Sequence, residues 1–202
     1  DYQKTNGPFE SPQHFDRLNI FAKYTQELKN NSRFALSLAH FKSKWDASGQ
    51  IPERAVISGL IGRFGSIDDT EGGATARTNL VFKFNKSISE HLDFKTTFFY
   101  SKYDFELYSN FTFFLNDPIN GDQIRQKESR NVFGFESQIE KRLLINGTKI
   151  NWQAGIGLRN DIVTNDELSN TINRLTTLSQ IQLGDINETN NYGFFSAEIS
   201  TG

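Results

Sequence analysis

The sequence predicts an all-β fold, an antiparallel sheet of about seven strands. Apolar and polar residues alternate with a period of two along seven segments, which is the pattern of strands with one apolar and one polar face. The connections between these segments are alternately short and long. No run of ~18 apolar residues occurs, which excludes a membrane-spanning helix but leaves open a barrel whose strands present every second side chain to lipid.

The alternation is clearest between residues 150 and 159, where five apolar residues share one side and the intervening residues are polar or glycine. The apolar residues are Ile150, Trp152, Ala154, Ile156 and Leu158. The other predicted strands are 18–25, 34–39, 79–84, 92–101, 133–139 and 195–200. Three bulky residues fall on the polar side as exceptions, namely Phe21, Val81 and Phe99.

The connections predict a sheet with short turns at one end and long loops at the other. Short turns are expected at 29–32, 86–90 and 145–148, and Asn146-Gly147 is a strong signal for a two-residue hairpin turn. Long polar segments are expected at 46–75, 107–127 and 163–190. Within the first of these, the segment 51–56 predicts the start of a short helix, with Pro52 and Glu53 in its first turn.

This combination is typical of transmembrane β-barrels, which have short periplasmic turns and long extracellular loops. Lipid offers no hydrogen bonds, so the sheet must close on itself, with its apolar side toward lipid and its polar side toward a wet lumen. Seven strands do not readily close, so we expect a segment of a larger barrel. We expect Asn151, Gln153 and Arg159 to line the lumen. The residues predicted to face lipid are Leu18, Ile20, Leu36, Leu38, Phe82, Phe94, Phe98, Phe133, Phe135, Ile150, Trp152, Ile156 and Leu158.

Composition removes several classes of site. With 0 Cys the chain has no disulfide, thiolate metal site or cysteine nucleophile. The formal charge of -2 disfavours a nucleic-acid partner. No Gly-x-Ser-x-Gly elbow or other catalytic signature occurs, so we expect neither an enzyme nor a cofactor. The histidines His14, His40 and His91 lack the spacing of metal ligands.

Two further groups of residues have both a functional and a plain interpretation. Asp68, Asp69 and Glu71 offer oxygen ligands for calcium, but their spacing favours a solvated acidic loop and we expect no metal there. Gly155 and Gly157 do not form a phosphate cradle, because no helix follows them. They are expected to leave room beside a bulky neighbour or a plug.

Three arginines near the first long loop are the candidate ligand-binding residues: Arg54, Arg63 and Arg77. Guanidinium groups match carboxylates, so these side chains suit an anionic ligand such as a ferric chelate. The ordinary alternatives are that they act as counter-ions for the nearby carboxylates or for lipid phosphates.

Three stretches carry a resemblance to TonB-dependent outer-membrane receptors: NGPFESPQHFDRLNIFAKY, SKWDASGQIPERAVISGLIGRFGSIDDTEGGATARTNL and FTFFLNDPINGDQIRQKESR. The resemblance lies in the sequences of the loops and in the order of the strands. It implies that residues 1–202 are part of a larger, 22-stranded barrel, without the plug domain and the TonB box.

The resemblance also implies a function, location and partners. The function is TonB-energised uptake of a scarce nutrient, such as a ferric siderophore, across the outer membrane of a Gram-negative bacterium. The implied partners are outer-membrane lipid, a small-molecule or metal-chelate ligand, and TonB through the missing N-terminal part. Two alternatives stay open at this point: a passive porin-like barrel, and a soluble all-β module that binds glycans or lipids.

Overall fold

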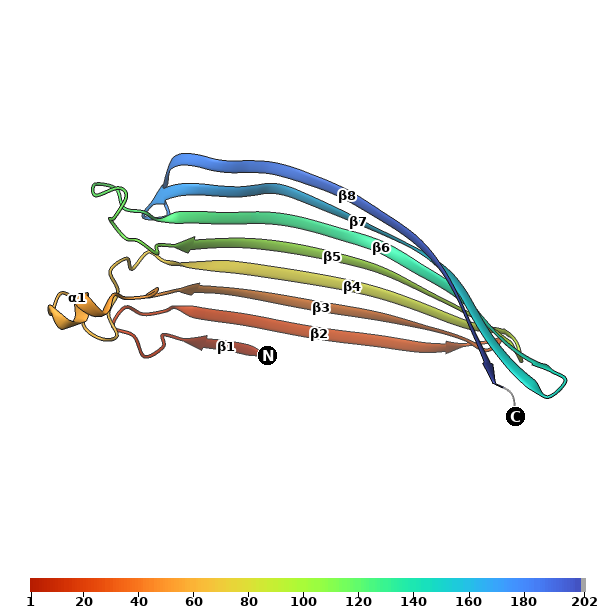
Figure 1. The fold of residues 1–202 in the computed structure, drawn as a ribbon. Helices are drawn as coiled ribbons and strands as arrows, with labels where there is room; N and C mark the ends of the chain where they lie inside the picture. The colour runs from red at the N-terminus through yellow and green to blue at the C-terminus, as the bar shows by residue number, and fades with distance from the viewer. Residues whose placement is uncertain (201–202) are drawn as a thin grey trace.

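The computed structural model describes residues 1–200 as one antiparallel sheet of eight strands in sequential order, with one short helix (Figure 1). No helix in this described part is long and apolar enough to cross a membrane. The elements are β1 (Tyr2–Thr5), β2 (Phe15–Leu28), β3 (Ser32–Asp46), α1 (Glu53–Ile57), β4 (Gly72–Ser89), β5 (Leu92–Ser109), β6 (Ile124–Ile145), β7 (Thr148–Ile172) and β8 (Thr176–Ser200).

The sheet is a single curved layer whose two ends differ. α1, the long loops and the turn between β7 and β8 lie at the left end of Figure 1, and the turns β2–β3, β4–β5 and β6–β7 lie at the right end. Each strand contacts its sequence neighbours, and no second layer packs on either face of the described residues. Only four hydrophobic side chains are buried within residues 1–200, namely Ala55, Tyr108, Phe113 and Val163. The sheet therefore has no conventional hydrophobic core.

The seven predicted strands are confirmed as β2 to β8, and β1 is an additional short strand that the alternation did not reveal. The predicted long loop at 163–190 is wrong, because β7 continues to Ile172 and β8 starts at Thr176. That stretch contains eight aliphatic residues, but they do not follow a period of two, and register shifts interrupt the ladder between Val163 and Thr171. It therefore shows no regular alternation even though its backbone pairs across the ladder. The other two long loops are confirmed, but shorter, at 47–71 and 110–123.

The β2–β3 and β6–β7 turns follow from residues that tolerate positive φ. Asn30 and Asn31 have φ of 60° and 53°, and Asn146 and Gly147 have φ of 50° and 82°. Two consecutive residues with positive φ form the type I′ turn, whose twist matches that of the strands it joins. The helix predicted from 51–56 is also present, with Pro52 preceding it and Glu53 in its first turn.

Candidate membrane-contact face and loop-end site

The register of the ladder places all thirteen predicted lipid-facing residues on one face of the sheet, which we call the apolar face. Side chains directly opposite each other on neighbouring strands point to the same face. One such row crosses five strands through Leu36, Phe82, Phe98, Phe135 and Leu158. Many of these side chains are exposed, and Ile156, for example, is 60% exposed.

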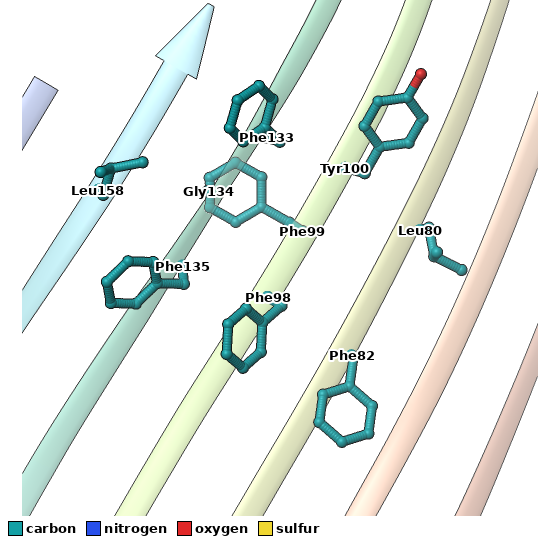
Figure 2. Close-up of a pocket in the computed structure, with 9 residues that line it drawn as sticks. All are labelled: Leu80, Phe82, Phe98, Phe99, Tyr100, Phe133, Gly134, Phe135 and Leu158. Carbon is teal, nitrogen blue, oxygen red and sulfur yellow. The ribbon is translucent and has the colours of Figure 1, made fainter. Parts of the chain in front are cut away.

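Aromatic rings line up across the apolar face. The ring centroids of Phe34 and Phe82 are 6.1 Å apart, those of Phe82 and Phe98 are 6.4 Å apart, and those of Phe98 and Phe135 are 5.9 Å apart. Figure 2 shows the rings of Phe82, Phe98 and Phe135 on adjacent strands, beside a shallow hollow of about 350 Å³. Its apolar-face lining is Leu80, Phe82, Phe98, Tyr100, Phe133, Phe135 and Leu158.

The apolar residues form a band that crosses the strands diagonally. In β3 the band is centred on Leu36, whose row reaches Asn191 in β8. In β8 the band is centred on Ala197, so it moves six residues along the strands while it crosses five strand-to-strand steps. At ~3.3 Å per residue and ~4.8 Å per strand, this drift corresponds to strands tilted by about 40° from the normal to the band. Strands of membrane barrels tilt by ~35–45° from the barrel axis.

The opposite face, which we call the polar face, carries ion pairs between neighbouring strands. Lys95 lies 2.7 Å from Glu140, and Arg142 lies 2.8 Å from Asp93. The register also places Asn151, Gln153 and Arg159 on this face, which was predicted to line a lumen. Arg159 forms a 2.6 Å pair with Asp161 on its own strand.

Bulky side chains on the polar face cover glycines of the neighbouring strand. Phe99 is paired with both Val81 and Gly134, and a β-carbon at Gly134 would lie 2.7 Å from the Phe99 ring. Two of the exceptions to the alternation are therefore neighbours that fill one space. Gly155 and Gly157 lie in the same way beneath rings of β8, and the closest ring carbon is 2.6 Å and 2.3 Å from the β-carbon that each lacks. Their bulky neighbours are thus part of this sheet.

At the loop end, Arg174 in the turn between β7 and β8 reaches back across the sheet to β3 and its loop. Its guanidinium donates to Asp46 at 2.8 Å and to the backbone carbonyls of Thr70 and Glu71. It also lies over the ring of Tyr108, 5.6 Å from the centroid. Sequence reasoning missed this residue, because the turn carried no Gly and lay inside the expected loop at 163–190.

Buried amides complete the loop-end network. Gln123 donates to Asp68 at 3.1 Å and to Thr70 at 2.7 Å, and it accepts from Thr171 at 3.0 Å. Asn110 donates through its side chain to Asp68 at 2.9 Å and through its backbone to Glu71. These contacts join the 47–71 loop, the 110–123 loop and the end of β7 into one unit.

The two loop carboxyls of this network have opposite pKa shifts. Burial disfavours the charge on Asp68, but hydrogen bonds from Thr70, Asn110 and Gln123 outweigh it and hold the pKa of Asp68 below its ordinary value. Burial raises the pKa of Glu71, and the nearby charge of Asp68 adds to that shift. Oε2 of Glu71 is buried without a hydrogen-bond partner. No cluster of three or more metal-ligating side chains is found within residues 1–200.

The three candidate arginines occupy different places. Arg54 in α1 lines a hollow of about 620 Å³ between the 47–71 and 110–123 loops. Arg63 lies in the 62–65 turn, which contacts the segment before β2 through a hydrogen bond between Glu10 and Phe64. Arg77 is inside β4 on the polar face, 4.7 Å from the ring centroid of Tyr103. The structure therefore does not gather them into one site.

The histidines are similarly dispersed. His14 precedes β2 and bonds Asp46 at 2.8 Å, and His40 in β3 bonds Thr78 at 2.9 Å. His91 lies in the turn between β4 and β5, where its carbonyl accepts from the backbone of Arg142.

Comparison with solved structures identifies the architecture. The crystal structure of ferric citrate transporter FecA in the unliganded form superposes with a TM-score of 0.72 over 94% of this chain. The fold is that of a β-barrel segment. At 12% identity the likeness establishes the fold of this barrel segment alone, and the chain spans 28% of the length of that transporter. No protein-family model matches the chain, and no match is found among curated proteins.

Proposed function

We propose that this chain is part of the barrel of a TonB-dependent receptor in the outer membrane of a Gram-negative bacterium. In this proposal the apolar face contacts lipid and the polar face lines the lumen. The tight turns face the periplasm, and the long loops capture a scarce nutrient, such as a ferric siderophore, at the cell surface. TonB acts through a part of the receptor outside this chain.

The diagonal apolar band is the observation that supports this proposal most strongly. A soluble sheet buries its apolar side under a second layer, and no such layer covers the band in residues 1–200. A bilayer is a flat slab, so tilted strands that cross it must present their apolar residues at a position that shifts steadily from strand to strand. The drift from Leu36 to Ala197 has the size that this geometry requires.

The proposed uptake of a nutrient is supported by the loop end of the sheet. The hollow beside Arg54 lies between two loops, and its other lining residues include Phe113 and Phe114. A guanidinium beside aromatic rings suits an anionic chelate with an apolar body. We assign Arg54 and Arg63 to the mouth of the receptor and Arg77 to its wall, where a ligand would arrive after capture.

The lipid contact is tested by quenching of single tryptophans with lipids brominated on their acyl chains. The chain has 2 Trp, so in a receptor whose tryptophans outside this chain are replaced by Phe, Trp45→Phe leaves Trp152 on the apolar face as the sole reporter. The matched control combines Trp45→Phe, Trp152→Phe and Gln153→Trp, which moves the reporter by one residue to the polar face. Strong quenching of Trp152 and weak quenching of the control are expected. Equal quenching of both reporters would refute the assignment of the faces.

The energised uptake is tested in cells that carry the full-length receptor. Uptake of a radiolabelled ferric chelate should stop when the proton gradient is collapsed or TonB is deleted, whereas a passive porin-like barrel would continue to admit it. Arg54→Gln should weaken binding of an anionic chelate more than binding of a neutral chelate of the same size. Uptake that continues after collapse of the proton gradient and after deletion of TonB would favour the porin-like alternative.

A further inference from the structure

Three lysines gather on the apolar face of β1 to β3, just beyond the apolar band on the side of the long loops. The register places Lys42 in a row with Leu18 and Tyr2, and Lys44 in the next row of that face with Asp16 and Lys4. All three lysine side chains are exposed, and none has an ion-pair partner within residues 1–200. We call Lys4, Lys42 and Lys44 the lysine patch.

The lysine patch holds an excess of positive charge. Within β1 to β3, Asp16 is the one carboxylate in the two rows, and it accepts a hydrogen bond from Tyr2 at 3.2 Å. The rows continue through Ala76 and Ala74 of β4 to Asp104 and Glu106 in β5, two strands away from Lys42 and Lys44. On β1 to β3, three ammonium groups therefore share a single carboxylate. Farther along the sheet, the cations beyond the band are compensated: Lys102 lies 3.2 Å from Asp104, and Arg125 lies 2.5 Å from Glu167. The β1–β3 corner of the apolar face thus carries more lysines than carboxylates.

The lysine patch is placed for a ligand that has both an anionic and an apolar part. Along β3, Leu38 belongs to the apolar band and Lys42 follows four residues later, a distance of ~13 Å along the strand. A lysine side chain bends readily toward a charged group while its methylenes lie on apolar surface. An acyl chain resting on Leu38 and Ile20 would thus have its headgroup within reach of Lys42.

We infer that the lysine patch binds the headgroup phosphate of an anionic lipid whose acyl chains lie on the apolar band. The inference rests on the proposed contact of this face with a bilayer, and it adds a selectivity that an apolar band alone does not have. Lipid is favoured over a soluble anion because the uncompensated lysines stand directly beside exposed apolar side chains. Phosphate is the anionic group that membrane lipids present at this level.

The test uses the full-length protein folded in a zwitterionic detergent, with binding measured by native mass spectrometry. The probes are dihexanoyl phosphatidic acid, dihexanoyl phosphatidylcholine and inorganic phosphate. The double variant Lys42→Gln and Lys44→Gln removes two charges from the lysine patch. The matched control, Lys23→Gln and Lys83→Gln, removes two exposed lysines from the polar face that likewise lack ion pairs within residues 1–200.

The wild-type protein should prefer phosphatidic acid over phosphatidylcholine by about tenfold, since each lysine near a lipid surface contributes modestly. The patch variant should lose this preference and the control should keep it. A preference that survives in the patch variant, or falls equally in both variants, would overturn the inference. Inorganic phosphate that competes as well as the lipid would assign the patch to a soluble anion instead.

The quenching of Trp152 by brominated lipid separates this inference from the proposed function. Quenching without selectivity for phosphatidic acid would remove only the phosphate site and would leave the lipid-contact face intact. Absence of quenching would remove the lipid contact on which both rest. Circular dichroism of both double variants establishes that they keep the β-structure of the parent protein.

Discussion

The ring of Tyr192 on β8 lies across Gly157 on β7, so that a β-carbon at Gly157 would come within 2.3 Å of the ring. The missing side chain lets the tyrosine hydroxyl pass over β7 and donate to Glu136 on β6 at 2.6 Å. A glycine in the middle strand thus allows a contact between the two strands that flank it.

Gly157→Ala should destabilise the sheet by about 1 to 3 kcal/mol, because the new methyl group displaces the Tyr192 ring and breaks its hydrogen bond to Glu136. The measurement is denaturant unfolding of the protein folded in liposomes. The double variant Gly157→Ala and Tyr192→Ala should cost less than the sum of the two single variants, since each change removes the same contact. Additive costs would contradict this packing.

Ile156→Arg should lower the free energy of unfolding by about 2 to 4 kcal/mol if the apolar face contacts lipid near the bilayer midplane. Gln153→Arg, three residues away on the polar face, should have a mild effect because its guanidinium stays in water. Refolding and unfolding in liposomes would measure both values. Equal costs would defeat the assignment of the two faces.

Arg174→Ala should loosen the loop end without unfolding the strands. The change removes the ion pair with Asp46 and the guanidinium donors to the carbonyls of Thr70 and Glu71, of which Glu71 keeps the backbone N–H of Ala47. The expected local cost is about 1 to 3 kcal/mol, seen as faster proteolysis within the 47–71 loop. Arg174→Lys should recover only part of this protection, because one ammonium cannot reproduce the fork of the guanidinium. Cleavage rates that match the wild-type protein would show that Arg174 does not hold the loop.

Asp68 and Glu71 should give the loop end opposite responses to pH. The lowered pKa of Asp68 contributes stability above its ordinary pKa, and this contribution is lost as the pH falls through the lowered value. The raised pKa of Glu71 adds a penalty that is absent below its ordinary pKa and grows as the pH rises through the raised value.

Two isosteric variants separate these contributions. At neutral pH, Asp68→Asn should accelerate hydrogen exchange in the 47–71 loop, and Glu71→Gln should slow it. The measurement is the hydrogen-exchange rate of the loop at about pH 4 and about pH 7, corrected for the intrinsic exchange rate. The exchange rates of both variants should differ less from that of the wild-type protein at about pH 4 than at about pH 7. Acceleration of exchange by Glu71→Gln at neutral pH would mean that the ionised carboxylate stabilises the loop.

The strands and the two faces could be predicted from the sequence because they depend on local pattern. A side chain two residues farther along a strand returns to the same face, so the alternation in 150–159 was sufficient to place Trp152 and Ile156 together. Asn146 and Gly147 specified their turn by backbone preference alone. The same reasoning failed for 163–190, where the aliphatic residues do not keep a period of two and register shifts interrupt the ladder.

By itself, then, the sequence determined which side chains share a face, where most strands lie and where the tight turns fall, because each depends on residues close together in the chain. Only the tertiary structure decided that Phe99 covers Gly134, that Arg174 reaches Asp46, and that Lys4 and Lys44 flank Asp16 in one row. Those contacts join residues far apart in sequence. They depend on ladder register and on the path of the loops, which no local pattern encodes.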